Sequence, residues 1–322
     1  MREITVNKND AGQRLDKFIQ KRFKTMPLPL MYRFIRQKKI KVNAKRAEIN
    51  TMLCEGDVIK LFIPEEFFDE RSSAENSFMK LTPRLNVVYE DENIMLVEKR
   101  AGMIVHSDDE QETDTLIDHI KAYLYKKGEW NPEDENTFAP ALCNRIDRNT
   151  GGIVIAAKNA PTLRIINEKI KNNEITKKYL CAAHGIFDKK SATLKGWLRK
   201  DSKTNMVTVY EKKPRFNDAK EIITKYRVLS EKNGLSLCEV ELVTGRTHQI
   251  RAHFSSIGHA LLGDGKYGVN RDDKKKGYKF QALYSYHLTF SFKGEGDGIL
   301  EYLSGKSFSV DKNNIWFLSE FK

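Results

Sequence analysis

From residue 85 to the C-terminus, short apolar runs typical of strands alternate at irregular intervals with segments typical of helices. The irregular spacing argues against a sequence repeat, and nothing in it indicates the regular βαβ series of a parallel sheet. We therefore predict an α+β domain built around a mostly antiparallel or mixed sheet. The predicted strands cover residues 93–98, 152–157, 178–183, 220–229, 235–243 and 284–292.

Two helices are predicted in the same part of the chain. The first covers residues 160–172, with Asn159 as its N-cap. The second covers residues 247–257, with Thr247 as its N-cap and Gly258 at its end. Each helix is expected to begin at a side-chain oxygen that accepts a hydrogen bond from a free backbone N–H group.

The positive charge is concentrated near the N-terminus. The chain of 322 residues carries a formal net charge of +12, yet residues 17–47 contain eleven Lys or Arg and no Asp or Glu. The remainder of the chain therefore carries only +1. A basic helix face exposed only to solvent is the usual explanation of such a run. Here the complete absence of acidic residues favours nucleic acid as the partner.

Residues 12–62 have the pattern of a small α/β module. Helices are predicted at residues 14–19 and 30–36, and short strands at residues 39–42 and 56–61. The segment that follows is rich in Glu, Asp and Ser, which indicates an exposed linker. The predicted division of the chain is a module at residues 1–64, a linker at 65–80 and a large domain at 81–322.

The helix predicted at residues 30–36 separates apolar from basic residues. Met31, Phe34 and Ile35 share one face, which leaves Arg33 and Arg36 on the other. Residues predicted to bind RNA in this module are Arg33, Arg36, Lys38 and Lys39.

Composition argues against several protein classes. No apolar run approaches the roughly 20 residues that span a bilayer, and the sequence is polar from Arg2 onward, so we expect neither a membrane span nor a signal peptide. The cysteines are scattered, without a Cys-x-x-Cys pair, and no His-x-x-x-His pair is present. We therefore expect reduced thiols, no metal site and a location in the cytoplasm. The four cysteines are Cys54, Cys143, Cys181 and Cys238.

A short loop carries one carboxylate between two arginines. Asp147 lies between Arg145 and Arg148, and a turn connects it to the apolar residues 153–157. Nearby positive charge favours the ionised form of a carboxyl group, which suits a nucleophile or a base better than a proton donor. The simpler interpretation is a structural ion pair between Asp147 and one of its neighbours, which is the commoner case.

Five segments in order resemble the RluA-type pseudouridine synthase family. Residues 144–152 are similar to its catalytic loop, usually His-Arg-Leu-Asp-x-x-Thr-Ser-Gly, and residues 244–254 resemble its Gly-Arg-x-His-Gln-Ile-Arg segment. Residues 97–106 are similar to its Lys-Pro-x-Gly-x-x-x-His segment, residues 177–179 to its Lys-x-Tyr strand, and residues 262–268 to its Gly-Asp-x-x-Tyr-Gly turn. Five ordered matches over some two hundred residues form a specific signal.

This chain departs from the family pattern at four positions. Asn144 stands in place of His, Ile146 of Leu, Gly151 of Ser and Arg100 of Pro. None of these changes removes the aspartate, so they bear on the choice of substrate more than on the chemistry.

The resemblance implies isomerisation of uridine to pseudouridine in RNA, in a catalytic domain of pseudouridine-synthase fold. It implies that Asp147 is the catalytic residue, that Arg251 forms an ion pair with it, and that Tyr179 stacks on the target base. Arg145 would fill the gap left by the flipped base, and Arg246 would bind phosphate. No cofactor is expected, because no redox or group-transfer step occurs. The basic module resembles the S4 RNA-binding domain.

Other functions remain compatible with the sequence. An S4-like module favours large-subunit ribosomal RNA as the substrate, although the same chemistry on transfer RNA is an alternative. A non-catalytic RNA-binding factor in ribosome assembly is a second alternative. Asp147 could bond to C1′ or take a proton from C2′, and the sequence does not distinguish these two routes. We expect a monomer.

Overall fold

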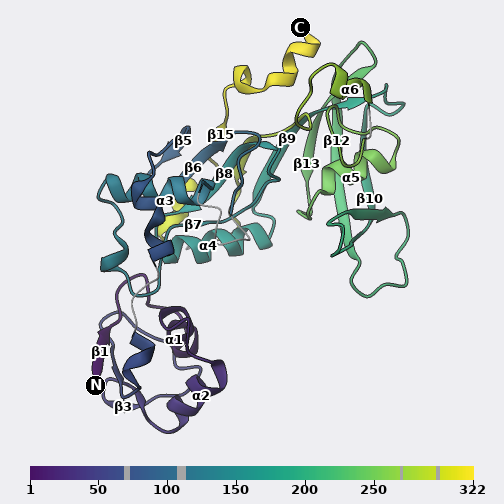
Figure 1. Ribbon diagram of the computed structural model, residues 1–322. Coiled ribbons are helices and arrows are strands. Elements are labelled where there is room, and N and C mark those ends of the chain that lie inside the picture. Colours follow the sequence, from purple (N-terminus) through teal and green to yellow (C-terminus); the bar gives the residue numbers. More distant parts are fainter. Residues whose placement is uncertain (69–72, 107–113, 269–270, 295–297) are drawn as a thin grey trace.

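The computed structural model describes residues 1–68, 73–106, 114–268, 271–294 and 298–322. Two separate sheets organise the chain. The N-terminal module forms a lobe of its own beside the rest of the molecule (Figure 1). Its antiparallel sheet has the order β1-β4-β2-β3. The elements of this lobe are β1 (Arg2–Thr5), α1 (Leu15–Arg22), α2 (Leu28–Arg36), β2 (Ile40–Val42), β3 (Lys45–Arg46) and β4 (Val58–Leu61).

Helix α2 has the predicted division of its faces. Met31, Phe34 and Ile35 are buried against the apolar core of the lobe, whereas Arg33 and Arg36 are exposed. Strand β1 was not predicted, because its residues are mostly exposed and have no apolar alternation. It is held instead by its pairing with β4, which is a tertiary contact.

The large sheet has eleven strands in the described residues. Its main order is β11-β10-β12-β13-β9-β14-β8-β6-β5, with β15 paired to β14 and β7 to β8. Among these pairs only β14 and β8 are parallel, so the predicted α+β class with a mixed, mostly antiparallel sheet is confirmed. The strands are β5 (Val87–Glu90), β6 (Ile94–Lys99), β7 (Ala141–Leu142), β8 (Gly151–Ala157), β9 (Ile175–His184), β10 (Ser191–Lys200), β11 (Val207–Tyr210), β12 (Lys220–Lys232), β13 (Leu235–Leu242), β14 (Leu283–Phe290) and β15 (Ser307–Ser309).

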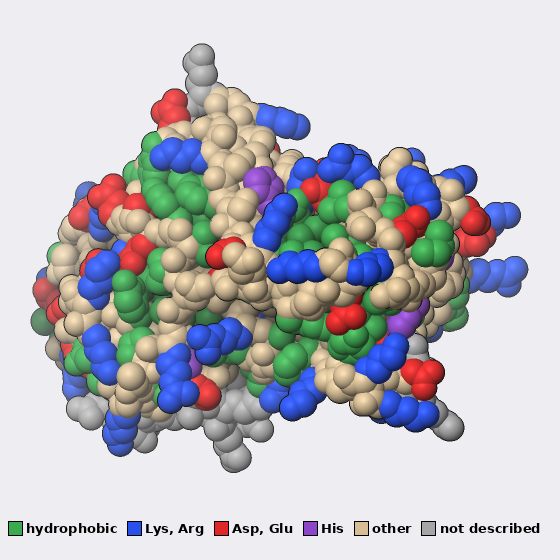
Figure 2. All heavy atoms as spheres, turned by 90° about the horizontal axis from the view of Figure 1, so that it is seen from above, with side chains coloured by type: hydrophobic (Ala, Val, Ile, Leu, Met, Phe, Trp, Pro, Cys, Tyr) green, Lys and Arg blue, Asp and Glu red, His purple; other side chains and the backbone are tan. Residues whose placement is uncertain are grey.

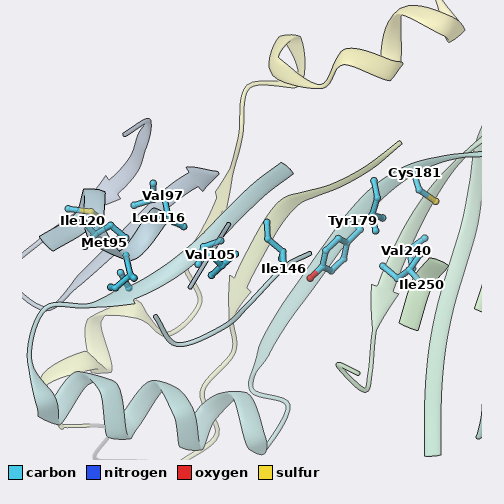
Figure 3. Close-up of a cluster of buried hydrophobic side chains, with 14 of the residues drawn as sticks. Met95, Val97, Val105, Leu116, Ile120, Ile146, Tyr179, Cys181, Val240 and Ile250 are labelled. Carbon is cyan, nitrogen blue, oxygen red and sulfur yellow. The ribbon is translucent and has the colours of Figure 1, made fainter. Parts of the chain in front are cut away.

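Both faces of the central strands of this sheet are covered. Along β8, Val154 and Ala156 belong to one apolar cluster and Ile153 and Ile155 to the other, as the alternation of a strand requires. The first cluster includes residues of α3 and α5 and is seen in part in Figure 3. The second includes residues of α4 and of the C-terminal turns. The helices are α3 (Leu116–Lys126), α4 (Ala160–Lys171), α5 (Gln249–Ser256) and α6 (Arg271–Lys275).

The segment predicted to be an exposed linker is partly buried. The 3-10 helical turns η1 (Glu65–Phe68) and η2 (Ser73–Lys80) lie within it, and residues 69–72 are outside the described part. Phe78 is only 2% exposed and packs on Trp130, with 5.3 Å between ring centroids. Phe68 packs edge-on against Phe23 of the module. The prediction of an exposed segment was wrong, because Phe68 packs on the N-terminal module and Phe78 packs on the large domain.

Polar contacts join the N-terminal module to the large domain. The fully buried Asp10 accepts hydrogen bonds from Asn136 and Thr137, both at 2.6 Å. Gln13 donates to the Thr137 hydroxyl at 3.0 Å, and the backbone N–H of Ala160 donates to the side chain of Asn9 at 3.0 Å.

In the described residues, no helix is both long enough and apolar enough to span a bilayer.

Candidate active site

A cavity of about 480 Å³ lies where the loop that carries Asp147 meets β9 and the segment before α5. Its lining includes Asp147, Tyr179 and Arg251, together with Arg145 and Arg246. The structure thus brings these five predicted site residues to one place. Arg33, Arg36, Lys38 and Lys39 do not line this cavity, because they are exposed on α2 and the turn after it in the N-terminal lobe.

The loop that carries Asp147 is fixed at its far end by two glycines. Gly152 has φ +118°, and a Cβ atom there would lie 2.2 Å from the backbone oxygen of Ser285. A Cβ atom on Gly151 would lie 2.3 Å from the ring of Tyr284. Gly152 therefore has to be glycine, and the departure from Ser at Gly151 gives room to Tyr284.

A buried lysine joins the same loop to the segment that follows β6. Lys99, which is fully buried at the end of β6, donates hydrogen bonds to the backbone carbonyls of Arg100, Met103 and Arg148 at 3.0, 2.8 and 2.8 Å. Burial lowers the pKa of Lys99 to about 7, against the opposing effect of the charge of Asp147. Three carbonyl acceptors match the three hydrogens of the ammonium form, so they favour the protonated state.

Arg251 joins two carboxylates. Its Nη1 donates to Asp147 Oδ2 at 2.8 Å, and its Nε and Nη2 donate to the two oxygens of Asp264 at 2.7 and 2.9 Å. Burial alone would raise the pKa of the Asp264 carboxyl, but the interactions with Arg251 hold that pKa below its ordinary value. Burial would likewise lower the pKa of Arg251, and the two carboxylates raise it instead. The guanidinium is therefore permanently charged beside Asp147.

Helix α5, which carries Arg251, begins later than predicted. Thr247 is not its N-cap. The position before the helix is His248, in the left-handed conformation with φ +55°, and no side chain caps it. The buried amide of Gln249 holds this turn instead, because it accepts hydrogen bonds from the Arg246 N–H and the Thr244 hydroxyl. This arrangement turns His248 toward the cavity, which it also lines.

His248 is the second neighbour of the Asp147 carboxylate. Its Nε2 lies 3.9 Å from Asp147 Oδ2, and its Nδ1 lies 2.8 Å from the Tyr267 hydroxyl. That hydroxyl accepts a hydrogen bond from the backbone N–H of Val207 at 3.0 Å. Burial lowers the pKa of His248 and outweighs the charge of Asp147, so the ring is neutral at pH 7. In the tautomer in which the Tyr267 hydroxyl donates to Nδ1, the proton on Nε2 faces Asp147.

Tyr179 projects from β9 into the cavity. In Figure 3 its hydroxyl end points toward Ile146, the residue before Asp147. The side chain is mainly enclosed, with 6% of the residue exposed, and burial raises the pKa of its hydroxyl to about 12. The hydroxyl is therefore neutral at physiological pH and acts as a hydrogen-bond donor.

Unpaired cations lie at the mouth of the cavity. Arg145 and Arg246 are exposed there and have no ion pair with any described acidic residue. Lys177, on the same face of β9 as Tyr179, also lines the cavity, and burial lowers its pKa. More widely, Lys and Arg side chains are spread across the face seen in Figure 2 rather than gathered at one end.

Three residues of this site had no role in the sequence prediction: Lys99, His248 and Asp264. All three lie within the matched segments, so motif position was the available signal. Each of them also contacts a residue outside its own segment: Lys99 contacts Arg148, His248 contacts Asp147, and Asp264 contacts Arg251. Among the described residues, no group of three or more His, Cys, Asp or Glu could hold a metal ion.

Comparison with known proteins agrees with this geometry. Residues 93–256 match the family described as RNA pseudouridylate synthase. An uncharacterized RNA pseudouridine synthase of Mycoplasma genitalium is 33% identical over 296 residues, which are 89% of this chain and 88% of that protein. Ribosomal large subunit pseudouridine synthase C of Vibrio cholerae is 28% identical over 273 residues, 84% of this chain and 81% of that protein.

Solved structures share the fold. Human RNA Pseudouridylate Synthase Domain Containing 4 superimposes with a TM-score of 0.54 at 20% identity, over 70% of this chain and 88% of that one. Together with the sequence matches, this shows that the chain belongs to the RNA pseudouridylate synthase family, of the RluA type.

Proposed function

We propose that this protein converts uridine to pseudouridine in large-subunit ribosomal RNA, with Asp147 as the catalytic residue. The observation that carries the proposal is the pairing of Asp147 with Arg251 inside a cavity that also holds Tyr179. Arg251, which is itself held by the fully buried Asp264, orients the Asp147 carboxylate. The Asp147 side chain remains partly exposed, so its carboxylate is open to a ligand.

The reaction needs an anion at the sugar. The N1–C1′ bond breaks, and the electron pair leaves with N1 while positive charge develops at C1′. The uracil turns, C5 bonds to C1′, C5 loses its proton and N1 gains one. The Asp147 carboxylate can bond to C1′ or stabilise its charge, or it can take a proton from C2′. No electron or group is exchanged with another molecule, so the reaction needs no cofactor.

The other residues of the cavity bind and expose the base. The Tyr179 ring offers a stacking surface for a uracil extracted from the RNA, and its neutral hydroxyl can donate a hydrogen bond. Arg145, exposed beside Asp147, would fill the gap that the extracted base leaves. Arg246 is a ligand for backbone phosphate.

The N-terminal module is proposed as an S4-like RNA-binding domain. Arg33, Arg36, Lys38 and Lys39 are exposed together on α2 and the turn after it, and none forms an ion pair with a described acidic residue. Cations left unpaired in this way bind phosphates with release of counterions. The name of the Vibrio cholerae relative supports large-subunit ribosomal RNA as the target.

The test is a map of pseudouridines across total RNA from a strain that lacks this protein. Sites absent from large-subunit ribosomal RNA are expected, and they should return with the wild-type chain but not with Asp147→Asn. Missing sites in transfer RNA would overturn the target, and an unchanged map would overturn the activity. Restoration of the sites by Asp147→Asn would overturn the role of Asp147.

A further inference from the structure

A second cavity, of about 330 Å³, adjoins the first across the side chain of Arg251, which lines both. Its wall includes Asn149, two residues after Asp147 in the same loop, and Gln281, which donates to Thr150 of that loop at 3.1 Å. A ligand in this cavity would therefore be a near neighbour of a nucleotide held at Asp147.

Both carboxylates of this second cavity are already engaged by the protein. Asp264 is paired with Arg251 and accepts hydrogen bonds from the N–H groups of Lys266 and Tyr267 at 2.9 and 3.1 Å. Asp273 contacts His184 at 2.9 Å and accepts a hydrogen bond from the N–H of Gly263 at 2.8 Å. Neither carboxylate is left to neutralise a further cation.

Three lysines of the same wall are not neutralised in this way. Lys274 and Lys279 are exposed and form no ion pair with any described acidic residue. Lys266 donates to the backbone oxygen of Asn205 at 2.7 Å, which is a neutral partner. Burial is the largest cause that lowers the pKa of Lys266; the charges of Arg251 and Lys200 add to it, and those of Asp147 and Asp264 oppose it. Because both carboxylates of the wall are engaged, its three lysines leave an excess of positive charge. An anion is the ligand that this cavity favours.

We propose that this cavity binds a backbone phosphate of the RNA substrate, next to the target uridine, through Lys274 and Lys279. The inference rests on the proposed function, because a polynucleotide threaded past Asp147 supplies phosphates on both sides of the extracted base. Lysine binds phosphate as a point charge, and such contacts fix the register of a nucleic acid on a protein. The cavity would thus hold the neighbouring nucleotide and bring the target uridine to Asp147.

The chain offers a matched control for this proposal. Lys275 and Lys276 belong to the same run of lysines and are exposed, but they do not line the cavity. Lys275 pairs with the exposed Asp272, at 3.5 Å. The double variant Lys274→Gln/Lys279→Gln and the control Lys275→Gln/Lys276→Gln remove the same charge from neighbouring positions.

With a short RNA substrate, the cavity variant should raise KM and leave kcat at saturating RNA unchanged. Its plot of log Kd against log salt should flatten by about 0.7 for each phosphate that the protein no longer binds, whereas the control should keep the wild-type slope and KM. Equal effects of the two variants on KM and on the salt slope would overturn the proposed site, because the RNA would then respond only to the overall positive charge of this region. A wild-type protein without activity on any RNA would contradict the proposed function instead.

A second experiment locates the phosphate. Uncharged methylphosphonate linkages are placed one at a time on either side of the target uridine, and binding is measured with Asp147→Asn to prevent turnover. One linkage should weaken binding to the protein with intact lysines and have no further effect when Lys274→Gln/Lys279→Gln are added. Additive losses at every linkage would overturn the proposal, because the lysines and the phosphates would then act independently.

Discussion

The N-terminal module and the active site use charge in opposite ways. On α2 and the turn after it, the cations are exposed and have no acidic partner among the described residues. Inside the cavity, by contrast, the Asp147 carboxylate is paired: Arg251 lies between Asp147 and the fully buried Asp264, while Arg145 and Arg246 stay exposed at the mouth. Unpaired charge on a surface gives affinity for a polyanion, which salt weakens. Paired and buried charge instead fixes the position of one carboxylate.

The largest effect is expected from Arg251→Met. It removes the partner of Asp264, which is fully buried and would keep no cation. Breaking a buried pair from one side costs about 3–5 kcal/mol of unfolding free energy, and pseudouridine formation should be lost as well. Urea unfolding and an activity assay measure the two effects.

Arg246→Met is the control for that experiment, because Arg246 is an exposed arginine of the neighbouring turn. Its unfolding free energy should change by less than about 0.5 kcal/mol. Equal losses of stability in both variants would remove the distinction between paired and unpaired charge.

The next effect concerns the apolar part of the active site. Tyr179→Phe keeps the stacking surface and loses only the hydroxyl, whereas Tyr179→Leu loses both. Base stacking is worth about 1–3 kcal/mol, so Tyr179→Leu should weaken binding of a short RNA by that amount and Tyr179→Phe should bind normally. Fluorescence titration measures both, after circular dichroism has confirmed that each variant is folded. Equal RNA affinities of Tyr179→Phe and Tyr179→Leu would show that Tyr179 packs in the core and does not stack on the base.

Neutralising the exposed cations should affect binding and not stability. Arg33→Gln/Arg36→Gln should leave the unfolding free energy nearly unchanged, because both side chains lie on the exposed face of α2. The slope of log Kd for ribosomal RNA against log salt should flatten by about 0.7–0.9 for each phosphate that is no longer bound. The control Lys126→Gln/Lys171→Gln removes two exposed cations of the large domain and should keep the wild-type slope.

The smallest effect is a change in pH dependence. His248 is neutral at pH 7, because burial holds its pKa below the ordinary value of 6.5. Asp147 and Asp264 oppose this lowering, whereas Arg251 and Lys266 add to it. As the pH falls below that lowered pKa, His248 gains a proton and becomes a second cation against Asp147, which should reduce activity. In His248→Gln this acid limb should disappear from the pH profile of kcat, and its persistence would assign the limb to another group.

Periodicity and motifs predicted much of the fold but little of the geometry. Strands such as β8 and β9 were found because both their faces are buried, which makes the apolar run continuous. Strand β10 was missed, because polar residues and Gly196 interrupt its apolar residues, and its pairing with β12 holds it in place. Helix α3 was also missed, although Thr115 forms a capping box with Asp118 at its start.

The site shows a similar limit. The sequence singled out Asp147 and Arg251, which lie 104 positions apart and meet at 2.8 Å. It matched the turn that holds Asp264 as a motif, yet the role of that carboxylate became clear only from its contact with Arg251. A residue that acts through a partner distant in the sequence leaves no local periodicity to detect.

The contacts of Lys99 have a consequence for how this site can change during evolution. All three of its hydrogen bonds end on main-chain carbonyls, those of Arg100, Met103 and Arg148. Lys99 therefore joins the loop of Asp147 to the segment after β6 through atoms that every amino acid has, so substitutions at these three positions leave the connection in place. Side chains at these positions can diverge, as Arg100 has from the Pro of the family pattern, while the backbone contacts of Lys99 stay in place. Such an arrangement lets new substrates be acquired without rebuilding the chemistry.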